Sequence, residues 1–86
     1  MVTVDMTKTG NTIKDIMNKQ NIKVKDIQNL FGFNTPSCIY KWINGETLPT
    51  IDNLVILADF LNVGIEQIIC INKNSDNNKI TNTKVA

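Results

Sequence analysis

Four polar side chains between residues 36 and 44 are the groups in this sequence best placed for contact with a partner. They are Ser37, Tyr40, Lys41 and Asn44. At helical spacing Ile39, Trp42 and Ile43 fall on the opposite side, so hydroxyl, ammonium and amide groups remain on the outward side. These groups can exchange hydrogen bonds with base edges and phosphate oxygens. Two short helices joined by a turn, the second presenting such a face, fit the major groove of DNA.

The helix that carries these groups is expected over residues 36–44. Thr35 is its expected N-cap, and Pro36 suits the first helical position, where a missing N–H costs nothing. Asn44 and Gly45 end it. The preceding helix is expected over residues 24–31, and Gly32 follows as its stop signal.

Three further helices are expected around this pair. The first follows a cap at Thr9 or Asn11 and ends near Asn21, the fourth spans residues 51–61, and the fifth spans residues 65–71. No run alternates apolar and polar residues well enough to predict a sheet, and an extended segment at residues 2–4 would have no partner. The sequence therefore predicts an all-α fold, a five-helix bundle that contains a helix-turn-helix.

The chain of 86 residues is expected to form one small domain. We divide it into an N-terminal arm (residues 1–9), a helix-turn-helix domain (residues 10–71) and a flexible polar tail (residues 72–86). The sequence contains no apolar run near the ~20 residues that span a membrane, and no signal peptide is visible. We therefore expect a cytoplasmic protein that does not associate with membranes.

The composition argues against an enzyme or a metalloprotein. Histidine is absent, the carboxylates are scattered, and the two cysteines, Cys38 and Cys70, lack metal spacing. A disulfide is open in principle, but buried thiols are the favoured interpretation. We expect no catalytic residue, no metal and no cofactor. All nine basic residues are lysine and the net charge is +1, so bidentate arginine contacts to guanine are unavailable.

The segment from Ile39 to Ile69 resembles the helix-turn-helix domains of the Xre and lambda repressor–Cro type. The shared features are I-x-x-W-x-x-G at the end of the third helix, then L-P, then L-x-x-L-A-x-x-L-x-V in the fourth. The resemblance covers roughly residues 10–71. It implies a lambda repressor-like DNA-binding fold, in which the third helix enters the major groove and the second crosses the backbone.

The resemblance also implies roles for individual residues. The base-facing positions are Thr35, Pro36, Ser37 and Lys41. The positions near the DNA backbone are Lys23, Val24, Lys25, Tyr40 and Asn44. An ion pair frequent in such domains is replaced here by Met17 and Ile43, which we interpret as an apolar version of the same core contact. A solvated role for Lys41 and a packing role for Tyr40 remain open.

The leading hypothesis is a sequence-specific regulator of transcription, a repressor, that binds double-stranded DNA as a homodimer. Ile68, Ile69 and Ile71 offer a dimer surface, although they can equally close the core. The alternative is a protein-interaction module, an adaptor or antitoxin-like partner, that kept the fold but binds DNA weakly or not at all. The near-zero net charge and the missing arginines motivate this alternative.

Overall fold

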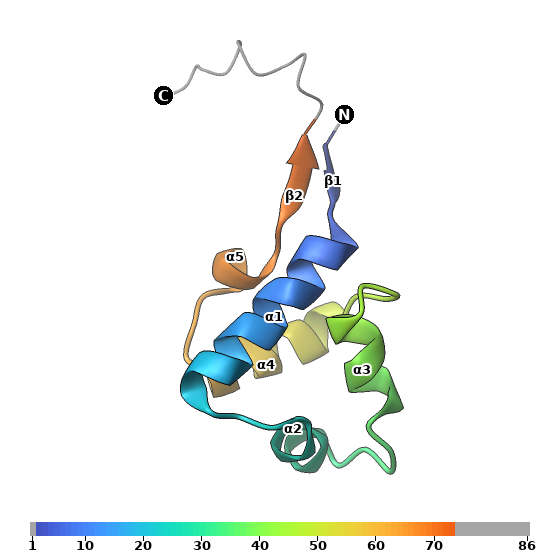
Figure 1. The fold of residues 1–86 in the computed structure, drawn as a ribbon, viewed down its shortest axis with the longest axis vertical. Helices are drawn as coiled ribbons and strands as arrows, with labels where there is room; N and C mark the ends of the chain where they lie inside the picture. Colours follow the sequence, from blue (N-terminus) through green and yellow to red (C-terminus); the bar gives the residue numbers. More distant parts are fainter. Residues whose placement is uncertain (1, 74–86) are drawn as a thin grey trace.

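A short antiparallel sheet projects from one end of a bundle of five helices in the computed structural model, which describes residues 2–73 (Figure 1). In chain order the elements are β1 (Val2–Val4), α1 (Met6–Gln20), α2 (Val24–Phe31), α3 (Ser37–Ile43), α4 (Ile51–Leu61), α5 (Ile65–Ile68) and β2 (Ile71–Lys73). The predicted five-helix fold is confirmed, with the sheet as an addition. Residues 74–86 of the predicted tail lie outside the described residues.

The core consists of apolar side chains that recur every three or four residues along the helices. From α1 come Ile13 and Met17, and from α4 come Leu54, Leu57 and Leu61. Residues three or four apart lie on the same face of a helix, so each helix turns one apolar stripe inward. The remaining buried apolar residues are Ile27, Ile39, Trp42, Ala58 and Ile68.

An aromatic cluster sets the position of α3 relative to α2. Phe31 ends α2, Phe33 lies in the turn, and their rings stack 5.0 Å apart. Trp42 of α3 meets both rings edge-on, at 5.7 Å from Phe31 and 6.2 Å from Phe33. Such pairs contribute about 0.5–1.5 kcal/mol beyond the burial of their area. The predicted core role of Trp42 is confirmed, since its side chain is only 3% exposed.

Two helices have the bounds predicted from sequence, because local signals end them. Gly32 terminates α2 in the left-handed conformation at φ +71°, which glycine adopts without a steric penalty. The Thr50 hydroxyl caps α4 by accepting the Asn53 N–H at 3.4 Å. Asn21 and Asn62 end α1 and α4, both with φ of +59°.

The first helix begins earlier than predicted, so the expected N-terminal arm is a strand followed by a helical turn. The N-cap is Asp5, whose carboxylate accepts the Lys8 N–H at 2.9 Å. The Asp5 side chain is as good a cap as Thr9 or Asn11. Thr9 instead lies buried in the helix, where its hydroxyl accepts the Cys70 N–H at 3.0 Å.

The prediction that residues 2–4 lack a strand partner was wrong. β1 pairs with β2 antiparallel, with Val2 opposite Lys73 and Val4 opposite Ile71. The fifth helix is accordingly shorter than predicted. It ends at Ile68, and Ile69 is already extended, so the chain from there runs out beside β1. The pairing joins the two ends of the described chain (Figure 1).

Candidate nucleic-acid interface

Helix α3 begins one residue later than predicted, and its cap differs. Pro36 occupies the N-cap position and Ser37 is the first helical residue. Thr35, expected as the N-cap, lies one residue before it. The Thr35 hydroxyl accepts the Ser37 N–H at 3.4 Å and donates to the Ser37 hydroxyl at 3.3 Å. Thr35 therefore still orders the start of α3, and both hydroxyls lie at the exposed end of the helix.

One side of α3 is anchored in the core and the other is exposed. Ile39 is fully buried and Trp42 nearly so. The exposed residues are Ser37, Cys38, Tyr40, Lys41 and Asn44. Cys38 was expected to be a packing residue and is an exposed free thiol instead. The remaining four form the outward polar face that the sequence predicts.

The start of α2 supplies the residues expected near a nucleic-acid backbone. Lys23 and Lys25 are exposed, and Val24 is half-buried. The Asp26 carboxylate accepts the Lys23 N–H at 2.8 Å and so caps this end of the helix. The structure thus places two ammonium groups at the start of the helix that precedes α3.

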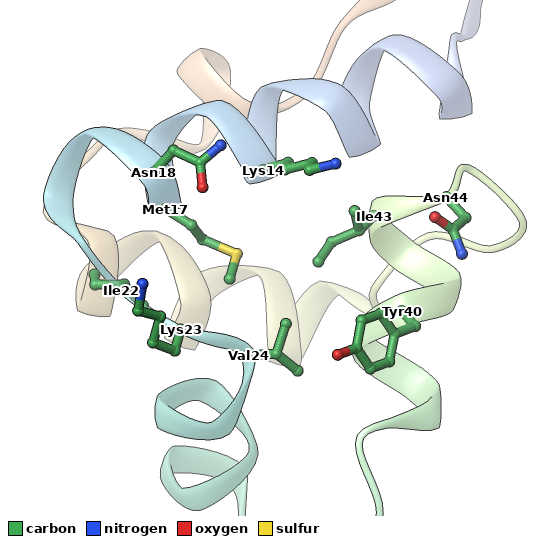
Figure 2. A pocket seen from close by; sticks show the side chains of 9 residues that line it. All are labelled: Lys14, Met17, Asn18, Ile22, Lys23, Val24, Tyr40, Ile43 and Asn44. Atoms are coloured by element: carbon green, nitrogen blue, oxygen red, sulfur yellow. The ribbon is translucent and has the colours of Figure 1, made fainter.

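A pocket of about 240 Å³ lies between α1, the start of α2 and α3 (Figure 2). Four of the predicted backbone-contacting residues line it: Lys23, Val24, Tyr40 and Asn44. The structure therefore brings these four together from two helices. Lys25 and the four predicted base-facing residues do not line the pocket.

Met17 and Ile43 line this pocket from opposite sides, with their side chains directed toward one another across it (Figure 2). They were expected to replace an ion pair by an apolar core contact. Met17 is 4% exposed, whereas Ile43 is only half-buried. The replacement thus leaves an apolar recess at this position.

The profile of the helix-turn-helix family matches residues 13–68. The chain belongs to the helix-turn-helix family. Within that family its helix-turn-helix is α2, the turn around Gly32, and α3, as the resemblance to Xre and lambda repressor-type domains implies. It is accordingly a DNA-binding protein of the class that regulates transcription.

Solved structures of two proteins share the fold. The restriction-modification controller protein C.AhdI from Aeromonas hydrophila superposes with a TM-score of 0.66 at 17% identity, covering 74% of this chain and 96% of its own. The DNA-binding domain of BldD superposes with a TM-score of 0.65 at 16% identity, and the superposition covers 77% of this chain and 94% of the BldD domain. No curated protein sequence matches the chain significantly.

Two residues of this helix-turn-helix protein near the interface were not predicted. Lys14 and Asn18 of α1 line the same pocket, and the Lys14 side chain extends from α1 toward α3 (Figure 2). A signal for both was present in the sequence. They lie three residues before and one residue after Met17, which was already expected to face Ile43. Lys14 lies three residues before Met17 and four residues before Asn18, and residues three or four apart lie on the same face of a helix.

The charges of the helix-turn-helix protein are divided between two parts of the chain. Residues 10–44, which contain α2 and α3, hold five lysines and two aspartates, a net charge of +3. Residues 45–72, which contain α4 and α5, hold four carboxylates and no lysine, a net charge of −4. The overall charge is near zero because the acidic segment offsets a cationic segment that includes the helix-turn-helix.

Neither a metal centre nor a membrane span is found in the described part of the chain. Within residues 2–73 no three His, Cys, Asp or Glu side chains are grouped so that they could hold a metal ion. None of the helices there combines the length and the apolar content that crossing a bilayer requires.

Proposed function

We propose that this protein is a sequence-specific repressor of transcription that binds operator DNA as a homodimer and places α3 in the major groove. The observation that carries the proposal is the two-sided character of α3. Ile39 and Trp42 fix the helix in the core, while its polar side chains remain exposed. A controller protein and a DNA-binding domain share this fold, which supports the same use of it here.

Base recognition would depend on four residues at the start and outward face of α3. Lys41 would donate to guanine O6 or N7, and Ser37 would donate to or accept from several bases. The Thr35 methyl group and the Pro36 ring offer apolar contact to a thymine methyl. Each good base contact discriminates by about 1–3 kcal/mol, so one subunit would select its site only weakly.

The DNA backbone would be held by side chains from both helices. Lys23 and Lys25 would approach it from the start of α2, and Tyr40 and Asn44 from α3, with the N–H groups around Val24 alongside. If about four phosphates are contacted, the salt slope per subunit is roughly −3.6, at about −0.9 per phosphate. One subunit would then bind weakly at cellular salt, which favours a dimer.

The exposed apolar residues of α4 are the better candidate for the dimer surface. Ile51 is 77% exposed, and Val55, Ile56 and Phe60 of the same helix are 48%, 43% and 37% exposed. The earlier candidate included Ile68, which is fully buried in the core and cannot contribute. Of that candidate only Ile71, in β2, is well exposed. A two-fold dimer would double the base contacts and link them.

The alternative, a protein-interaction module without DNA affinity, is disfavoured by the charge division. The cationic segment of residues 10–44, which includes the helix-turn-helix, is suited to polyanions, whereas the acidic segment that follows contains α4 and α5. The proposed site of action is the cytoplasm, where operator DNA would be met.

Fluorescence anisotropy would test the proposal with the whole chain. We would titrate DNA flanking the gene, and a scrambled duplex of equal length, from low to moderate salt. Tighter, saturable binding to the flanking DNA that is lost in Lys41→Ala would support the proposal. Equal binding to both duplexes that disappears with salt would refute sequence-specific recognition of this DNA and favour the interaction module.

A further inference from the structure

The pocket between α1, α2 and α3 has an apolar interior. Met17 and Ile43 point into it from opposite helices, and Val24 faces them from the start of α2 (Figure 2). A DNA phosphate touching the rim would leave this interior unused, because a phosphodiester offers it no apolar group. The lining therefore suits a ligand that has an apolar body.

The size of the pocket limits what it can hold. The pocket is open to solvent on one side, and its volume of about 240 Å³ exceeds the ~150 Å³ of an enclosed apolar cavity that accepts benzene. It is smaller than the roughly 300–1,000 Å³ of sites for drug-sized molecules. A ligand with one aromatic ring and a short side chain has a size between these two limits.

The charges at the pocket favour an anionic group on that ligand. The Lys14 ammonium group extends toward α3, the Lys23 ammonium group lies at the opposite side of the pocket (Figure 2), and no Asp or Glu is among the lining residues. The nearest acidic residue on α2 is Asp26, whose carboxylate is engaged with the Lys23 N–H at 2.8 Å. The Tyr40 hydroxyl, directed toward Val24 in Figure 2, offers a further hydrogen bond.

We propose that this pocket binds a small organic carboxylate with an apolar body, whose carboxylate meets Lys14 while the body contacts Met17 and Ile43. Binding would interfere with DNA, a step that rests on the proposed function. Lys23, Val24, Tyr40 and Asn44 line the pocket and are also the proposed contacts to the DNA backbone. A bound anion would occupy the same groups, so the ligand would act as an inducer that releases operator DNA.

Methyl NMR on the whole chain would test binding without DNA, with 3-phenylpropionate as the probe. Met17 is one of three methionines in the sequence, and Met6, at the start of α1, is an internal control outside the pocket. We expect saturable shifts of the Met17 and Ile43 methyl signals with a Kd on the order of a millimolar. The neutral 3-phenylpropanamide should bind more weakly.

Variants of the rim lysines would keep the test independent of folding, because both side chains are exposed. Lys14→Gln should weaken binding of 3-phenylpropionate by up to about five-fold. Lys23→Gln, at the opposite side of the pocket, should weaken it less. Lys19→Gln, on α1 but outside the pocket, is the matched control and should bind as the wild type does. Equal binding of the carboxylate and the amide, or shifts that include Met6 equally, would overturn the proposal.

Measuring DNA binding with and without 3-phenylpropionate would separate this proposal from the proposed function. If 3-phenylpropionate binds and raises the apparent Kd for operator DNA in the wild type but not in Lys14→Gln, both proposals are supported. If the ligand binds but leaves DNA affinity unchanged, the inducer role is refuted and the ligand site stands. If DNA binds but the probe does not, the pocket proposal fails alone.

Discussion

The close approach of α1 to the end of α3 makes a sharp prediction at Gly10. A Cβ atom at this position would lie 2.5 Å from the Ile43 carbonyl oxygen and 2.9 Å from its carbonyl carbon, and it would also meet the Trp42 carbonyl oxygen. All three are backbone atoms, which cannot rotate aside as a flexible side chain would. Gly10→Ala therefore requires the two helices to separate.

Gly10→Ala should lower the free energy of unfolding, although helix propensity alone would raise it. In an exposed helix interior, Gly→Ala stabilises by about 0.8–1.0 kcal/mol. Overpacking of a well-packed interior costs about 1–3 kcal/mol and sometimes more, and the rigid backbone at Gly10 favours the upper part of that range. We expect a net loss of about 1–2 kcal/mol in the free energy of unfolding. For a domain of this size each kcal/mol lowers Tm by roughly 4–8 °C.

Thermal and urea unfolding, followed by circular dichroism, would measure this loss. The matched control is Asn11→Ala, the next residue in α1, which is exposed. It gains helix propensity without a contact and should be as stable as the wild type or slightly more so. If Gly10→Ala unfolds at or above the wild-type temperature, the proposed packing of α1 on α3 is refuted.

Three further substitutions test other parts of the structure. Thr9→Val removes the buried hydroxyl that accepts the Cys70 N–H; it should destabilise by about 1–3 kcal/mol in urea unfolding, and a neutral result would refute a structural role for this bond. Asn21→Ala places a Cβ-bearing residue without a polar side chain at φ +59° and should lower stability by about 1–2 kcal/mol, whereas Asn21→Gly should not; equal Tm values would contradict this. Ile51→Lys changes a side chain that is 77% exposed; light scattering should show a dissociated dimer with unchanged helical content, and an unaltered mass would show that α4 is not the interface.

Local signals explain which helices could be predicted from the sequence. Gly32 ends α2 because glycine readily adopts the left-handed conformation, and Thr50 begins α4 through its side-chain hydrogen bond. Neither signal depends on distant residues. The start of α1 was less determined, because Asp5, Thr9 and Asn11 are all good caps. Burial of Thr9 against Cys70, far away in sequence, decides between them.

Features that depend on distant residues could not be predicted. β1 pairs with a strand near the other end of the described chain, with Val4 opposite Ile71. No local sequence pattern predicts this pairing. The pocket likewise exists only because Met17 and Ile43 come from helices that pack at a particular distance. The sequence predicted that these two residues meet, but not that space remains between them.

The outward face of α3 was predicted because helical periodicity alone separates its two sides. Ile39 and Trp42 are buried as expected, and Lys41 is exposed. Which of the exposed residues touch bases stays a prediction, since contacts to DNA depend on how the whole domain docks.

Selection from a random double-stranded DNA library, with the wild type and Lys41→Ala in parallel, would test most directly whether α3 reads DNA sequence. For the wild type we predict enrichment of an inverted repeat whose half-site centres are about 10 base pairs apart. For Lys41→Ala we predict the same repeat with one position relaxed, because a base contact has been lost. If the folded wild-type protein enriches no sequence, or if Lys41→Ala enriches a site identical at every position, recognition through the outward face of α3 is contradicted.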